Sequence, residues 1–174
     1  MIEGKRVFLK KIEEKNLSKI LNWINNYEIS YFIGNEWPVS YEENKIWYQK
    51  LLNDTTKRIF GIYFKENNEY IGNISIRDIN LRYRNAQLTI FIGEDKFRKK
   101  GLAQDSVLTL LKYCFEYLNL HRIYVFIHEN NIDSINLFQK CGFIKEGLMR
   151  EHEYHNGKYI NKVIMGILKS EFKE

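Results

Sequence analysis

The stretch from residue 86 to 118 most constrains what this chain can fold into. An apolar, β-branched run over residues 86–93 predicts a strand that is buried on both faces. A basic turn at residues 97–103 follows, and apolar residues then recur at the spacing of one helix face. The segment therefore predicts a strand, a tight turn and a helix that begins at Gly101.

The basic turn has the chemistry of a phosphate-binding loop. The first N–H groups of a helix lack internal partners and carry the positive end of the helix dipole, so they favour an anion. Gly101 has no Cβ and lets the backbone approach a bulky phosphate, while Arg98, Lys99 and Lys100 add positive charge. The pattern Arg-x-x-Gly-x-Ala is short, however, and also suits an ordinary solvated helix cap. The rest of the chain has to distinguish the two interpretations.

Two further segments make the pattern specific. A second strand-like run at residues 122–128 leads into Asn131 and Ser134, and a Gly-Phe pair follows at residues 142–143. Together with the basic turn, this order resembles the GNAT family of N-acetyltransferases, in particular its branch of ribosomal-protein alanine and spermidine or diamine acetyltransferases. The resemblance extends over most of the chain.

The resemblance implies an α/β fold in which about seven strands form a mixed, mostly antiparallel sheet flanked by about four helices. Length and composition agree with a single N-acetyltransferase domain over residues 1–174, because no linker or repeat interrupts the chain. Hydrophobic periodicity adds the remaining elements. We expect strands at 6–12, 58–64, 70–79 and 122–128, helices at 17–24 and 41–51, an irregular aromatic loop at 27–39, and a hairpin whose Asn156-Gly157 turn joins 151–155 to 158–168.

The resemblance also implies acetyl-CoA as the cofactor and direct transfer of its acetyl group to an amine, without a covalent enzyme intermediate. In the family, the turn binds the pyrophosphate, and the central strand pairs with the pantetheine arm and donates an N–H to the oxyanion. Asn131 and Ser134 are candidates both for binding and for catalysis, although a helix cap also explains them. The predicted cofactor-binding residues are Ile90, Phe91, Ile92, Arg98, Lys99, Lys100, Gly101, Leu102, Ala103, Asn131 and Ser134.

The family covers its acceptor site with the early helices. We therefore expect acceptor contacts at Tyr31, Phe32, Glu36 and Trp37, although core aromatics explain the rings equally well. The acceptor is a primary amine, either a small one such as a polyamine or amino sugar, or the N-terminus of a protein such as a ribosomal protein. A formal charge of +5 weakly disfavours a highly cationic acceptor. Exposed aromatics in the same segment would suit a homodimer contact.

The chain departs from the family at both proton-transfer positions. Many relatives carry a tyrosine at the position of Phe138 and a glutamate at that of Gln87, and neither residue here can serve as an acid or a base. Tyr154, Tyr159, Glu36 and Asp78 are substitute candidates, and Tyr154 joins Asn131 and Ser134 as a predicted catalytic residue. The alternative to an enzyme is an acyl-CoA binding or sensing module without turnover.

Composition excludes several other classes. The start of the sequence lacks the apolar region of a signal peptide, and no run approaches the ~20 apolar residues of a membrane span, so we expect a cytoplasmic protein. Cys114 and Cys141 resemble small buried hydrophobes, and the four histidines show no metal-ligand spacing, so no metal is implied. Lys and Arg are scattered among acidic residues, which argues against a nucleic-acid surface.

Overall fold

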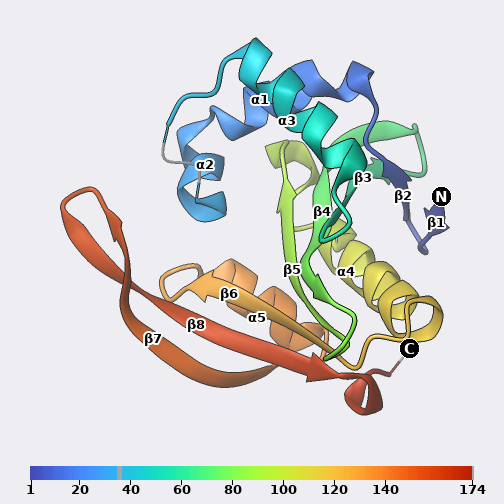
Figure 1. The fold of residues 1–174 in the computed structure, drawn as a ribbon, viewed down its shortest axis with the longest axis vertical. Coiled ribbons are helices and arrows are strands. Elements are labelled where there is room, and N and C mark those ends of the chain that lie inside the picture. The colour runs from blue at the N-terminus through green and yellow to red at the C-terminus, as the bar shows by residue number, and fades with distance from the viewer. Residues whose placement is uncertain (35–36, 174) are drawn as a thin grey trace.

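The computed structural model describes residues 1–34 and 37–173, and its strands form one eight-stranded sheet in the order β1-β2-β3-β4-β5-β6-β8-β7 (Figure 1). Every neighbouring pair is antiparallel except β5 and β6. The sheet is therefore mixed and mostly antiparallel, as the sequence predicted. Its strands are β1 (Ile2–Glu3), β2 (Val7–Lys11), β3 (Arg58–Phe64), β4 (Glu69–Asn80), β5 (Asn85–Ile92), β6 (Arg122–His128), β7 (Ile144–His155) and β8 (Lys158–Leu168).

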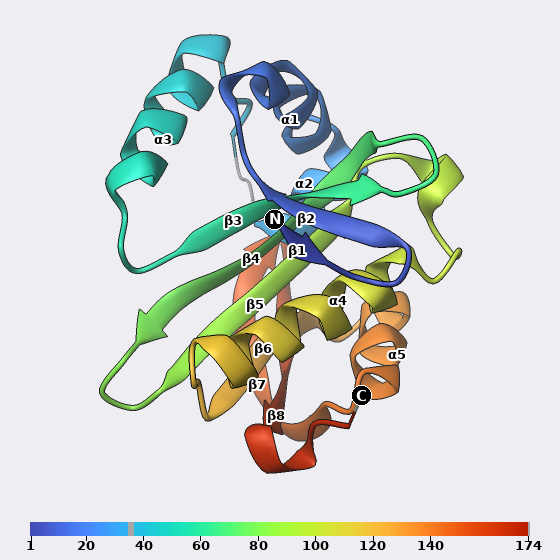
Figure 2. The same cartoon turned by 90° about the vertical axis from the view of Figure 1, so that its right-hand side faces the viewer.

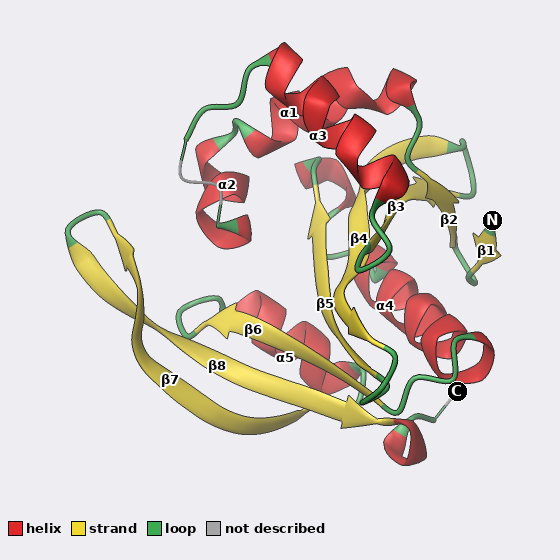
Figure 3. Ribbon diagram, in the orientation of Figure 1, coloured by secondary structure: helices red, strands yellow, loops and turns green. Residues whose placement is uncertain are grey.

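The parallel pair at the centre of the sheet is only partly formed. Residues 85–87 of β5 pair with residues 122–124 of β6, and the two strands then run apart to their ends (Figure 3). Beyond these pairs, the edges of β5 and β6 that face each other have no partner within the sheet. Unpaired strand edges carry rows of N–H and C=O groups that can bind an extended ligand.

The helices divide between two cores (Figure 2). The larger core lies between the sheet and the two later helices, α4 and α5, and includes Ile62 of β3. Tyr63, the next residue of β3, points to the opposite face and packs in a smaller core with Leu17, Ile20 and Trp23 of α1. The helices are α1 (Leu17–Ile24), α2 (Tyr27–Ile33), α3 (Tyr41–Asn53), α4 (Leu102–Lys112) and α5 (Ile132–Lys140).

Within residues 1–34 and 37–173, eight strands and five α-helices replace the expected seven and four. The added strand is the two-residue β1, and the added helix is α2, where the sequence predicted an irregular loop. Asn26 starts α2, because its side chain accepts a hydrogen bond from the backbone N–H of Glu28, and Gly34 ends it with a left-handed φ of 77°. These two caps stabilise a seven-residue helix whose composition alone favoured a loop.

Two expectations for the central segment were wrong in detail. The helix after Gly101 is regular only to Lys112 and then forms a π-helical turn over Tyr113–Tyr117, in which the N–H of Leu118 bonds the Tyr113 carbonyl at 3.2 Å. Strand β5 is not buried on both faces: only Ala86 and Leu88 are fully buried, and its other residues are half-buried. Residues 87–92 line a cavity instead.

Within the described ranges, no helix is both long and apolar enough to cross a membrane. Both cysteines are buried, as expected, and burial raises the pKa of each thiol to about 12. They therefore pack as small apolar side chains and not as nucleophiles.

The first turn of α4 is tied to the start of the sheet through Asp105. Its carboxylate accepts hydrogen bonds from the backbone N–H groups of Lys5, Arg6 and Val7, at 3.1, 2.6 and 3.0 Å. An acidic side chain in the first turn also interacts favourably with the helix dipole. This contact fixes the N-terminus of α4 relative to β2.

We expect Asp105→Ala to lower the free energy of unfolding by about 1–3 kcal/mol, because three backbone donors lose a charged acceptor. Chemical denaturation measures the change. Glu116→Ala, an exposed acid further along the same chain segment, is the matched control and should change stability by less than about 0.5 kcal/mol. Equal stabilities for the two variants would contradict this account of α4.

Candidate active site

A cavity of about 1130 Å³ opens where β5 and β6 separate. It is lined by Ile90, Phe91 and Ile92 of β5, by residues 125–128 of β6 and by the start of α5. Small-molecule sites usually measure about 300–1000 Å³, so this cavity is at the large end of the range for ligand sites. The predicted cofactor strand therefore borders this cavity.

The basic turn lies at one end of this cavity and has the features of an anion site. Gly101 is the N-cap of α4, with φ 78°, and no side chain caps the helix there. The N–H of Asp105 bonds the Gly101 carbonyl at 3.0 Å, so the N–H groups before it, at residues 102–104, have no acceptor within the helix. Arg98 lines the cavity, and Lys99 and Lys100 are exposed beside it. These residues fit a diphosphate.

The start of α5 contributes polar groups to the same cavity. Asn131 is the N-cap of α5, and its Oδ1 accepts a hydrogen bond from the Ser134 N–H at 3.1 Å. Both residues line the cavity, so capping and ligand binding are compatible there. Phe138 is buried with its ring 4.9 Å from that of Phe143, which leaves no proton donor at that position.

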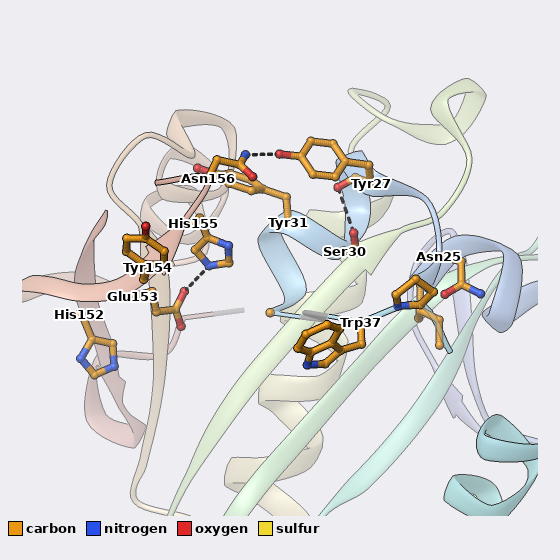
Figure 4. Close-up of a pocket in the computed structure, with 13 residues that line it drawn as sticks. Asn25, Tyr27, Ser30, Tyr31, Trp37, His152, Glu153, Tyr154, His155 and Asn156 are labelled. Carbon is orange, nitrogen blue, oxygen red and sulfur yellow. Dashed lines mark hydrogen bonds and ion pairs between the residues drawn. The ribbon is translucent and has the colours of Figure 1, made fainter. Parts of the chain in front are cut away.

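The predicted acceptor residues separate into two groups. Tyr31 and Phe32, on α2, line the cavity, and Tyr31 also borders a second hollow. Trp37 is 78% exposed and lines this second hollow of about 730 Å³ beside the β7–β8 hairpin (Figure 4). Glu36 lies outside the described residues.

Tyr154 also lies in the second hollow and not in the main cavity. It is 63% exposed, and its ring contacts that of Tyr159 at 5.2 Å. Its neighbours in β7 point to the opposite face, towards α2 and β6 (Figure 4). This placement gives Tyr154 no contact with the predicted cofactor strand.

Sequence reasoning missed a cluster formed by His128, Glu153, His155 and Lys162, here called the His128 cluster. One carboxylate oxygen of Glu153 lies 2.6 Å from Nε2 of His128 and 3.3 Å from Nε2 of His155. The other oxygen accepts a hydrogen bond from the Lys162 ammonium. The only hint in the sequence was a Glu-x-His pair, which a strand places on one face.

The four histidines show no metal-ligand spacing in the sequence, yet three side chains of this cluster offer ligand atoms within 4.8 Å of one another. A cation would have to share the Glu153 carboxylate with the Lys162 ammonium, which already neutralises it. We therefore assign the cluster no metal.

Burial and hydrogen bonding set the charges in the His128 cluster. Burial acts to raise the pKa of Glu153, but hydrogen bonds from Lys162 and His128 outweigh it and hold the pKa at about 2. Burial lowers the pKa of His128 below its usual value, against the opposing influence of Glu153. Around neutral pH, the cluster therefore combines a carboxylate with a neutral imidazole.

Residues 6–144 match the acetyltransferase (GNAT) domain family. The chain belongs to the GNAT family. It is 32% identical to the spermidine N(1)-acetyltransferase of Vibrio cholerae over 94% of each chain, and 26% identical to that of Escherichia coli K12 over 95% of this chain and 88% of the relative. The crystal structure of the Vibrio cholerae spermidine N-acetyltransferase in complex with CoA and spermine superposes with a TM-score of 0.89, at 31% identity, over 97% of this chain and 98% of the other.

GNAT enzymes transfer an acetyl group from acetyl-CoA, so this chain is an N-acetyltransferase with acetyl-CoA as its donor. Membership confirms the family resemblance, the mixed α/β fold and the cofactor that the sequence predicted. The individual cofactor contacts remain predictions. When acetyl-CoA is bound, it supplies the thioester that an amine attacks.

The basic turn can be tested at Gly101. Gly101→Ala adds a Cβ at a left-handed φ, but the nearest atom that this Cβ would meet is Nη1 of Arg6, at 3.8 Å, so the protein has room for it. We expect the Kd for CoA to rise at least about tenfold, because the methyl group would stand between the backbone N–H groups and a phosphate. Calorimetric titration measures the change.

Gly157→Ala is the matched control, because Gly157 has φ 79°, no atom within 4 Å of an added Cβ and a place at the tip of the β7–β8 hairpin. Both variants should lose about 1 kcal/mol of stability from the left-handed backbone. Only Gly101→Ala should lose CoA affinity. The same Kd for CoA in both variants would show that the basic turn is not part of the cofactor site.

Proposed function

We propose that this enzyme acetylates a primary amine of a polyamine such as spermidine. Its curated relatives from Vibrio cholerae and Escherichia coli are named as spermidine acetyltransferases and align with most of the chain. The observation that carries the proposal is the acceptor side of the main cavity, which combines carboxylates with aromatic rings.

Glu28 of α2 and Glu43 of α3 line the cavity, together with Tyr31, Phe32 and Trp47. Glu43 bonds the backbone N–H of Ser40 in a capping box, and hydrogen bonds from that backbone and side chain lower the pKa of Glu43. It is therefore ionised at neutral pH. Carboxylates attract ammonium groups, and aromatic faces bind them through cation–π contacts.

The excess of positive charge in the sequence weakly opposed a cationic acceptor. The charge near the site predicts the charge of the acceptor better than the net charge of the protein does, because exposed charges more than about 8–10 Å apart are largely screened at physiological salt. The basic side chains of the turn belong to the anionic end of the cavity. The acceptor end has its own acids, which supports a polycation there.

The proposal is tested by following thiol release from acetyl-CoA with a thiol reagent, against spermidine, spermine, putrescine, amino sugars and peptides with N-terminal Ala or Ser. We expect the highest kcat/KM with spermidine or spermine. The compound 1,8-diaminooctane is the matched control, because it keeps two terminal amines but lacks the inner one. A higher kcat/KM with amino sugars or peptides would reject the polyamine assignment.

The role of the acceptor carboxylates is tested with Glu28→Gln. Removing one partner of an exposed ion pair costs up to about 1 kcal/mol, so KM for spermidine should rise about two- to fivefold while KM for acetyl-CoA stays constant. Glu42→Gln is the control, since Glu42 is an exposed acid on α3 that does not line the cavity. Parallel shifts in both variants would indicate a general loss of negative charge and not a contact.

A further inference from the structure

We propose that His128 is the general base that takes the proton from the attacking amine, and that Glu153 positions it. Both side chains belong to the His128 cluster and line the main cavity. The inference rests on the proposed function only for the choice of amine, because any acetyl transfer to an amine has to remove this proton.

His128 is singled out by its place on the cavity wall. The wall strands β5 and β6 contribute ten residues, at positions 87–92 and 125–128, and His128 alone among them has a titratable side chain. Gln87 stands where relatives carry a glutamate, and an amide is not a useful base. The wall that borders the predicted thioester site therefore offers one group able to accept a proton.

Hydrogen bonding determines which ring nitrogen of His128 can accept a proton. The Glu153 carboxylate can only accept hydrogen bonds, so Nε2 of His128 carries the proton that joins the two groups at 2.6 Å. The lone pair of the neutral ring is then on Nδ1. Among the described residues, Nδ1 is the one buried side-chain nitrogen or oxygen without a hydrogen-bond partner. Leaving a buried acceptor unpaired costs about 1–3 kcal/mol, a cost that a role in binding the amine would explain.

The surroundings hold the ring in place. His128 lies opposite Lys162 in the pairing of β6 with β8, and His155 of β7 contacts its ring at 5.3 Å. Tyr31 and Phe32 of α2 cover it, with ring centroids at 5.3 and 5.8 Å. Among the described residues, Glu153, His155 and Lys162 are thus the charged or titratable groups around the imidazole, beside the Tyr31 phenol. When the ring gains a proton, Glu153 stabilises the imidazolium, while Lys162 opposes it.

The reaction step balances with these groups alone. The neutral amine attacks the carbonyl carbon of the thioester, a C–N bond forms, and one N–H proton moves to Nδ1 of His128. The C–S bond breaks and its electron pair leaves on the sulfur of CoA. Water then carries the proton from the imidazolium to the thiolate, whose pKa, near that of cysteine at about 8.5, makes it a tolerable leaving group. The absence of a tyrosine at Phe138 is consistent with this route.

The experiment compares kcat in wild type and His128→Gln, using whichever amine the wild type accepts at saturation. General bases contribute about 100- to 10,000-fold, so kcat should fall by at least about 100-fold while the Kd for CoA stays within about twofold. His121→Gln makes the same substitution at an exposed histidine just before the other end of β6, and it should retain wild-type kcat. Imidazole in the buffer should partly restore His128→Ala.

The pH profile distinguishes a base from a structural histidine. A base must be deprotonated, so wild-type kcat should fall as the pH drops through the lowered pKa of His128, below about 6.5. Glu153→Gln removes the group that stabilises the imidazolium, so this acid limb should move to lower pH. If His128→Gln does not fold, the wild-type and Glu153→Gln profiles carry the test.

Three results would overturn the proposal: a loss of kcat below about threefold in His128→Gln, an acid limb that Glu153→Gln does not move, or activity that a chelator removes and a divalent metal restores. Failure of spermidine as a substrate would instead reject the polyamine assignment and leave this comparison intact, because the variants are then measured with the amine that is accepted.

Discussion

The central constraint in this fold is that β5 and β6 pair over three residues each and then separate. Full pairing would satisfy the backbone of both strands and close the sheet. Separation leaves unpaired N–H and C=O groups on two facing edges, which is tolerable only where water or a ligand can reach them. The cavity, the basic turn after β5 and the cap of α5 after β6 all lie along this opening. An opening of this kind could accommodate an acetyl donor and an amine acceptor side by side.

The outer strands β7 and β8 supply the charged partners of His128, which the two central strands lack. The pairing of β6 with β8 sets His128 opposite Lys162, and β8 in turn pairs with β7. Two extra residues in β7 shift its register between Met149 and Glu153, and Glu151 within this bulge has φ 51°. A bulge re-aims the side chains that follow it. The carboxylate of Glu153 therefore reaches both His128 and Lys162. A hairpin with regular pairing and no bulge would not have predicted this contact.

The predictable part of the structure is the part that local physics determines. Strand periodicity predicted β3 and β6 with their observed bounds, and the Asn-Gly turn predicted the hairpin. Gly101 gave the start of α4. Helix α2 was missed because its two caps are individually weak signals, and the His128 cluster was missed because its members come from three strands. Register between β6 and β8 depends on tertiary pairing, and no local pattern encodes it.

The position of the proton acceptor is less constrained than the position of the thioester. A pantetheine arm that paired with β5, as we predict, would have its position fixed by the strand backbone, but a base needs only to face the same cavity within reach of the amine. Alternation along a strand restricts the choice to the residues on one face, which include Gln87 on β5 and His128 on β6. A chain with an amide at one of these positions can therefore use a titratable group at another. The carboxylate that orients such a group must then come from the adjoining strands, as Glu153 does here.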